Sequence, residues 1–463
     1  MVRYFFTLLF FTAAFILCGH SVLAADNEAT LSFEEAVALA LKQNLQLQSI
    51  QDRVTSATIS LGAALADFKL KVHPEISGFY QQDETLDRSY GIRFTKQFRY
   101  GGELSWEAKT FVDDSLDEEY RTDLGVNYRQ PLLKGRGTLP TTQTLLSAEQ
   151  NVRTQQRALI LGRQRLIVQV AASYYGIIRD RMMIAVNERS VERTQLLYRA
   201  AEAKLKVGMA SKMDVFRAKL QTLTAENSLV DAHASLEHAK RRFNLLLGAE
   251  IETEYLFPST LDYHPIALEP ALLLQTAQEK RLEIQDARER IAESERQLKI
   301  ATQNLLPPLD LSLSYTLRGE GNAFEKSLEL DDGFWGIGMT SSFDLNLAQE
   351  RAAFQQAKLS LNAAVRALKA TQNTITSEVL QAITKVRQAE ARVGLQKQSM
   401  VQAEKQLKLS GLRYKKGLSD NLDVVHAEEN FVKAKNSYYS AIVQHLVASR
   451  QLQQATGTLT EAF

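Results

Sequence analysis

An internal duplication constrains the fold of this chain more than any other feature of its sequence. Residues 204–215 read KLKVGMASKMDV, and residues 413–424 read RYKKGLSDNLDV. Gly417 repeats Gly208, and the two segments stay in register at an offset of 209 residues. Self-similarity of this kind is the signature of a repeated supersecondary unit. The sequence therefore predicts a chain built from two copies of one unit.

Each copy has the pattern of two helices joined by a tight turn. Basic residues precede the glycine, as they do at helix C-termini. A capping residue follows, Ser211 in one copy and Asp420 in the other. Asp214 and Asp423 stand three residues later, at the position that completes a capping box. Both segments thus predict a helical hairpin.

The N-terminus has the features of a secretory signal. Arg3 precedes an apolar run, and small residues end at Ala24, so residues 1–24 are predicted to be cleaved. Cys18 leaves lipid attachment as an alternative, although the residues before it lack the usual small side chain. Cleavage after Ala24 would leave a mature chain without cysteine, and hence without disulfides or a thiolate metal site.

Composition and motifs exclude several classes of function. The 55 basic and 54 acidic residues nearly cancel, so nucleic acid is not an expected partner. No nucleophile elbow, phosphate loop or zinc motif is found, and the histidines are scattered, which predicts no catalytic residues, no metal and no cofactor. After the signal no stretch has the roughly 20 apolar residues of a membrane helix.

Helical periodicity fills most of the chain. A capping box at Ser32 and Glu35 opens the first predicted helix. One helix would be about 100 Å long at 1.5 Å per residue, which predicts an elongated coiled-coil body. The predicted helices span about 33–71, 141–207, 213–247, 272–306, 347–416 and 421–456.

Strand periodicity interrupts the helices once in each copy, at about 74–131 and about 308–345. Apolar and polar residues alternate there, and Gly101 and Gly102 mark a hairpin turn that has no equivalent in the second copy. The predicted organisation is a signal peptide at 1–24, a first repeat at 25–257, a linker at 258–270 and a second repeat at 271–463.

The strands have the length of about 9 to 11 residues and the single apolar face that a strand crossing an outer membrane requires. An ordinary antiparallel sheet with one wet side is the alternative. Four to six strands cannot close a barrel, and open edges are not tolerated in lipid. The strands therefore predict a barrel shared between chains, with twelve strands if three copies contribute four each. The additional hairpin around Gly101 and Gly102 would either cap the barrel outside the cell or add strands to it.

The order of these elements resembles the TolC family of outer-membrane efflux proteins over essentially the whole mature chain. The resemblance is carried by LSFEEAVALA at 31–40, QPLLKGRG at 130–137 and YKKG at 414–417 followed by Asp423 and Val424. It implies a mainly α fold with transmembrane β-strands, in which the duplicated long-helix hairpins form a periplasmic α-barrel and the strands join a trimeric outer-membrane β-barrel.

The resemblance also implies a function and partners. A homotrimer in outer-membrane lipid would serve as the exit duct of a tripartite efflux or type I secretion system. It would be passive, gated at its periplasmic tip, and docked there by a periplasmic adaptor protein and an inner-membrane pump. The turns at Gly208 and Gly417 are the implied docking points.

The implied gate residues are Asp423, His426, Tyr414 and Asp214. Asp423 would form a carboxylate ring, and His426 stands where the family's best-known member has a second acidic residue. Tyr414 matches a gate-bracing tyrosine, but Ser419 replaces its usual basic partner. The aspartates have a simpler alternative role, because carboxylates are favoured at helix N-termini.

A second class of protein fits the helices equally well. A periplasmic coiled-coil adaptor or scaffold that does not span the membrane would also use long hairpins. The strands discriminate, since the β-domains of an adaptor need mixed cores, whereas these strands carry one apolar face with tryptophan and tyrosine.

Overall fold

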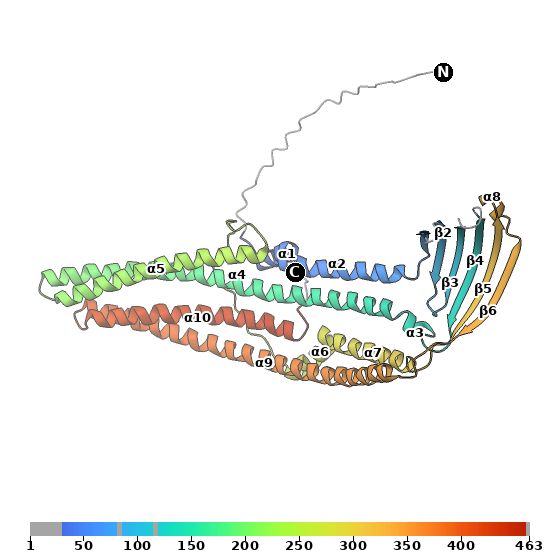
Figure 1. Ribbon diagram of the computed structural model, residues 1–463. Coiled ribbons are helices and arrows are strands. Elements are labelled where there is room, and N and C mark those ends of the chain that lie inside the picture. Colours follow the sequence, from blue (N-terminus) through green and yellow to red (C-terminus); the bar gives the residue numbers. More distant parts are fainter. Residues whose placement is uncertain (1–29, 81–85, 114–118, 460–463) are drawn as a thin grey trace, which may run out of the picture.

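The computed structural model describes residues 30–80, 86–113 and 119–459. The molecule is a long rod of helices with a sheet at one end and two helical hairpin turns at the other (Figure 1). The predicted signal peptide, with Cys18, lies outside the described residues. The mainly helical fold with long hairpins is confirmed, whereas the division into domains stays a prediction.

The helical body consists of two long hairpins, each accompanied by a pair of shorter helices (Figure 1). The helices α1 and α2 pack along α4, and α6 and α7 accompany α9 in the same way. No described helix is long and apolar enough to cross a membrane. The helices are α1 (Phe33–Gln43), α2 (Leu45–Ala66), α3 (Thr138–Thr141), α4 (Gln143–Lys206), α5 (Lys212–Leu247), α6 (Pro270–Lys280), α7 (Leu282–Gln303), α8 (Phe324–Ser327), α9 (Ala348–Lys415) and α10 (Asn421–Ala455).

The prediction of one unbroken helix before each set of strands is wrong. Asn44 separates α1 from α2, and Arg281 separates α6 from α7; both have extended backbones, with ψ of 120° and 122°. The Asn44 side chain accepts from the amide of Leu47 and donates to the carbonyl of Leu246, so it caps α2 and ties it to α5. Arg281 instead pairs with Glu283 and with Glu378 of α9. In each copy a contact to another helix fixes the break.

The strands form one antiparallel sheet of six in the order of the chain. The first copy contributes four of them, because the predicted turn at Gly101 and Gly102 joins β2 to β3. Six strands lie at the upper end of the predicted four to six per chain, and the number that each chain gives to a shared barrel stays a prediction. The strands are β1 (Lys71–Tyr80), β2 (Leu86–Gln97), β3 (Glu103–Asp113), β4 (Glu119–Pro131), β5 (Asp310–Gly321) and β6 (Asp332–Thr340).

A histidine lies in one of the thin cores between the helices. His445 of α10 is 1% exposed, and its ring packs edge-on against Tyr263 with 4.9 Å between centroids. Neither ring nitrogen has a hydrogen-bond partner among the described residues. Burial lowers the pKa of His445, and the nearby Glu390 carboxylate opposes this only in part.

The buried His445 makes stability depend on pH. The unfolded chain takes up the imidazole proton near pH 6.5 and the folded chain only at lower pH, so stability falls as the pH drops below about 6.5. We expect the thermal midpoint to be lower at pH 5 than at pH 7.5. In His445→Leu the two midpoints should lie closer together, because the contribution of this imidazole is gone. The control is His238→Leu, at an exposed position. Equal pH profiles for wild type and His445→Leu would contradict the assignment.

Candidate functional site

The two hairpin turns at the tip of the rod have the same backbone design. Gly208 and Gly417 both adopt the left-handed conformation, with φ of 74° and 75°. The amide of Met209 donates to the carbonyl of Lys204 at 2.8 Å, and that of Leu418 to the carbonyl of Arg413 at 2.9 Å. Both bonds are those of a Schellman motif, which ends a helix at a left-handed glycine. The duplication is thus visible in individual hydrogen bonds.

The caps that follow the two turns differ. The Ser211 amide donates to the Asp214 carboxylate at 2.8 Å, and the Asp214 amide donates to the Ser211 hydroxyl at 3.2 Å, which together form a capping box. A hydrogen bond from the Ser211 amide is the main reason that the pKa of Asp214 lies below its usual value.

At the second turn the predicted capping box is absent. The Asp420 carboxylate accepts from the amide of Asn421, and Asp423 is exposed with no described hydrogen bond to the cap. A serine hydroxyl can donate to a carboxylate, whereas the ionised Asp420 cannot and would repel Asp423. The carboxylate of Asp423 is therefore left at the surface, whereas its counterpart Asp214 is hydrogen-bonded in the first cap.

Contacts across the duplication hold the two turns together. The side-chain amide of Asn421, which is fully buried, donates to the carbonyl of Asp214 at 2.6 Å. The Arg217 guanidinium lies 3.7 Å from the Asp214 carboxylate and 3.5 Å from that of Asp420. Asn421 and Arg217 therefore join the tips of the two hairpins.

Tyr414 lies between the hairpins, as a brace would, and its basic partner comes from the other copy. The Lys204 ammonium lies 3.7 Å from the centre of the Tyr414 ring and donates to the Tyr414 carbonyl at 2.5 Å. The ring packs with Leu197 and Val425, and burial raises the pKa of its hydroxyl. The position expected to hold this partner, beside Gly417, has Ser419 instead, and nothing in the sequence indicates a contact between Lys204 and Tyr414, which are 210 positions apart.

Asp423 and His426 lie apart from this cluster. They are three residues apart on the exposed side of α10, and His426 is 61% exposed. Its Nδ1 is 3.8 Å from the Glu429 carboxylate. The structure thus brings Tyr414 and Asp214 into the joint between the hairpins and leaves Asp423 and His426 facing outward in the single chain.

A further ion pair that the sequence did not indicate joins the hairpins below the tip. The Arg193 guanidinium of α4 donates two hydrogen bonds to the Glu428 carboxylate of α10, at 2.7 and 2.6 Å. Glu428 is 3% exposed, and the guanidinium also lies over the Phe431 ring at 5.6 Å. Beside this pair runs a groove of about 580 Å³ between α4, α9 and α10. Its apolar lining includes Leu196, Leu197, Leu407, Leu412, Val424 and Phe431.

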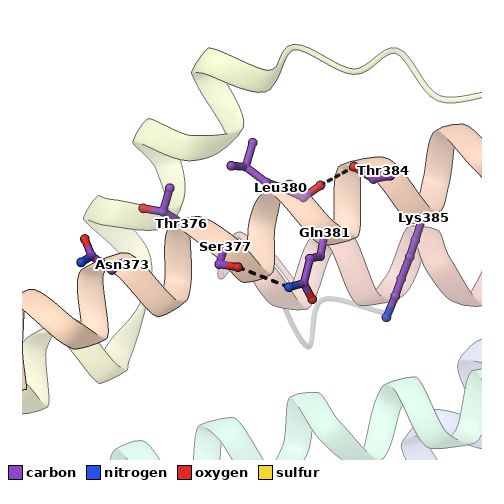
Figure 2. A pocket seen from close by; sticks show the side chains of 7 residues that line it. All are labelled: Asn373, Thr376, Ser377, Leu380, Gln381, Thr384 and Lys385. Carbon is purple, nitrogen blue, oxygen red and sulfur yellow. Dashed lines mark hydrogen bonds between the residues drawn. The ribbon is translucent and has the colours of Figure 1, made fainter.

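A second hollow, on α9, has no such chemistry. Figure 2 shows that its labelled side chains all come from one stretch of this helix, residues 373–385. Ser377 and Gln381 bond to each other at 3.2 Å, and Thr384 bonds to the carbonyl of Leu380. These are contacts within one helix turn and do not converge on a ligand. Nor do the described residues include any group of three or more metal-ligating side chains.

Comparison with known proteins connects this architecture to a family. The model of the family described as outer membrane efflux protein matches residues 273–458, the second helical repeat with its strands. A relative that covers both repeats is the outer membrane efflux protein BepC of Brucella suis, 25% identical over 97% of this chain and 90% of its own length. Its second half thus matches the outer membrane efflux protein family, and the chain as a whole is similar to a relative described as an outer membrane efflux protein.

Other relatives are similar to the chain as well. The probable efflux pump outer membrane protein TtgC of Pseudomonas putida is 23% identical over 74% of this chain and 70% of its own length. The crystal structure of the outer membrane protein VceC from Vibrio cholerae has the same fold, with a TM-score of 0.71 at 17% identity over 92% of this chain and 96% of that one. The matching family is described as outer membrane efflux proteins, and these relatives are outer membrane proteins.

Proposed function

We propose that three copies of this chain form a channel-tunnel that serves as the exit duct of a tripartite efflux or type I secretion system. The strands would form a shared barrel in the outer membrane, and the hairpins would continue it into the periplasm as an α-helical barrel. The observation that carries this proposal is the joint between the two hairpin turns, at the end of the rod opposite the sheet (Figure 1). The comparisons favour this channel over a periplasmic adaptor or scaffold.

The joint is suited to a gate at the periplasmic tip. Opening would move the hairpins apart and break the bonds from Asn421 to Asp214 and from Lys204 to Tyr414. Both hydrogen bonds join groups from different hairpins. They lie within a turn or two of the helix ends at the tip, where a small tilt of a long helix moves a side chain farthest. The channel itself is passive in this scheme, and the partner pump supplies the energy.

The surface of the tip is suited to docking. Apolar side chains are exposed at both turns, among them Val207 and Met209 at the first and Leu418 at the second. Exposed apolar side chains gathered at one place mark interaction surfaces. We infer that the turns at Gly208 and Gly417 contact a periplasmic adaptor protein, which links the channel to an inner-membrane pump.

Asp423 provides a test of the gate. In a trimer its exposed carboxylate would occur three times around the axis, and carboxylate oxygens are the ligands that hard divalent cations prefer. We expect Asp423→Asn to weaken the block of single-channel current by Mg²⁺ in planar bilayers about tenfold, a change of about 1.4 kcal/mol in binding free energy.

The matched control is Asp231→Asn, an exposed aspartate on α5 away from the tip, which should leave the block unchanged. Equal block in both variants would remove Asp423 from the gate. A protein that inserts into bilayers but conducts no current would count against the channel itself.

A further inference from the structure

The sheet has two more strands than the duplication requires, the additional hairpin β2–β3. Both strands have one apolar and one polar face, as strands of a membrane barrel do. The strand register aligns a row of apolar residues across the whole sheet, one from each strand. Phe94 and Trp106 of the additional hairpin stack in the middle of that row, with 5.3 Å between ring centres. The row consists of Val72, Phe94, Trp106, Val126, Tyr315 and Trp335.

Charge is nearly excluded from this face in every strand. Among the described strand residues on it, Arg88 and Lys96 are the only charged ones, and both lie near the ends of β2. The Lys96 ammonium donates to the carbonyl of Phe68, at the end of the sheet next to the helices. Charges on the lipid side of an outer-membrane barrel are tolerated near the interfaces and costly at the midplane. The pattern is that of a lipid-facing surface.

The opposite face is charged across the additional strands as well. Arg93 of β2 pairs with Glu75 of β1 at 3.0 Å and with Glu107 of β3 at 2.8 Å. Arg318 of β5 pairs with Asp123 of β4 at 2.8 Å. Lumen-facing side chains of such barrels are polar, and those facing lipid are apolar. The hairpin β2–β3 thus matches its neighbours on both faces.

The two edges of the sheet are compatible with each other. β1 leaves the helical body after α2 and β6 returns to it before α9, so the two strands run in opposite directions. Neither edge has a second partner strand in the described part of the chain. Open edges are not tolerated in lipid, and six strands are too few to close a barrel. A second copy of the chain offers the matching antiparallel edge.

We propose that all six strands of each chain cross the membrane, and that three copies close one eighteen-stranded barrel in which β6 of one copy pairs with β1 of the next. This inference rests on the trimer proposed above. Barrel diameter grows roughly in proportion to strand number, so the opening would be about 1.5 times as wide as twelve strands give. Barrels of 16 to 18 strands leave an aqueous channel.

The chain's two tryptophans provide the test, because Trp106 belongs to the additional strand β3 and Trp335 to β6. Trp335→Phe leaves Trp106 as the single fluorophore, and Trp106→Phe leaves Trp335. Each protein is reconstituted into vesicles of ordinary or brominated phospholipid, since bromine quenches indole only on contact with the acyl chains. We expect the two variants to lose the same fraction of their fluorescence.

Quenching of Trp335 without quenching of Trp106 would overturn the eighteen-stranded barrel and leave the shared barrel of the proposed function standing. Quenching of neither would overturn both. The edge pairing is tested separately by cysteine cross-linking. The chain's one cysteine, Cys18, lies in the predicted signal peptide, so only introduced cysteines would react in the mature protein.

For cross-linking, Phe334→Cys in β6 is combined with a cysteine at each polar-face position of β1 in turn, from Lys71 to Phe79. Neighbouring strands bring such residues within about 8 Å, whereas β1 and β6 of one chain are roughly 24 Å apart. A short bis-maleimide should therefore link chains into dimers and trimers on a denaturing gel in at least one combination. Native trimers without a link in any combination would exclude β1–β6 pairing.

Discussion

Replacing Gly248 with alanine is expected to destabilise the protein by about 3 kcal/mol or more. The residue has φ of 77°, where an L side chain costs roughly 1 to 2 kcal/mol. Its new Cβ would also lie 2.2 Å from the carbonyl oxygen of Gln43, at the end of α1. Overpacking of this kind adds about 1 to 3 kcal/mol, because backbone must move. The thermal midpoint in detergent, followed by circular dichroism, measures the effect.

The matched control for Gly248→Ala is Gly208→Ala. Gly208 has φ of 74°, and no neighbouring atom lies within 4 Å of the position of its Cβ. It should therefore show the backbone strain alone, roughly 1 to 2 kcal/mol. Equal losses in the two variants would mean that the contact between the end of α5 and the break after α1 contributes nothing.

Arg193→Met is expected to destabilise the joint between the hairpins by about 3 to 5 kcal/mol, because it leaves the Glu428 carboxylate buried without its partner. Removing both charges, with Arg193→Met and Glu428→Leu together, should restore much of the loss. The same thermal measurement applies, and bilayer conductance reports whether the loosened joint also opens the channel.

Arg241→Met is the control for this ion pair. Arg241 contacts Glu252 at 3.5 Å, and the Glu252 side chain is 79% exposed. Exposed pairs contribute about 0 to 1 kcal/mol, so little change is expected. A loss in Arg193→Met no larger than in Arg241→Met would show that the buried pair does not hold the hairpins together.

The fold was largely predictable because its determinants are local. The turns at Gly208 and Gly417 are marked by glycine, flanking charge and cap residues within a few positions of each other. The strands are marked by the alternation of apolar and polar residues. The breaks at Asn44 and Arg281 were missed, because neither proline nor glycine marks them and the contacts that fix them come from α5 and α9.

The tip was predictable only in part, for the same physical reason. Asp214 and Tyr414 were found from the turn they belong to, but Lys204, Arg193 and Asn421 act through partners more than 200 residues away. Contacts between the two copies produce no recognisable residue spacing in the sequence. The assignments of Asp423 and His426 depend on an axis that the single chain does not contain, and they stay predictions.

The central claim is that copies of this chain share one channel in the outer membrane, and the mass of the mature protein in mild detergent tests it most directly. Membranes would be fractionated, the outer membrane extracted, and the mass of the protein–detergent particle determined by light scattering with the detergent subtracted. The account predicts a particle of three chains from the outer membrane fraction. A monomer in the soluble periplasmic fraction would contradict it.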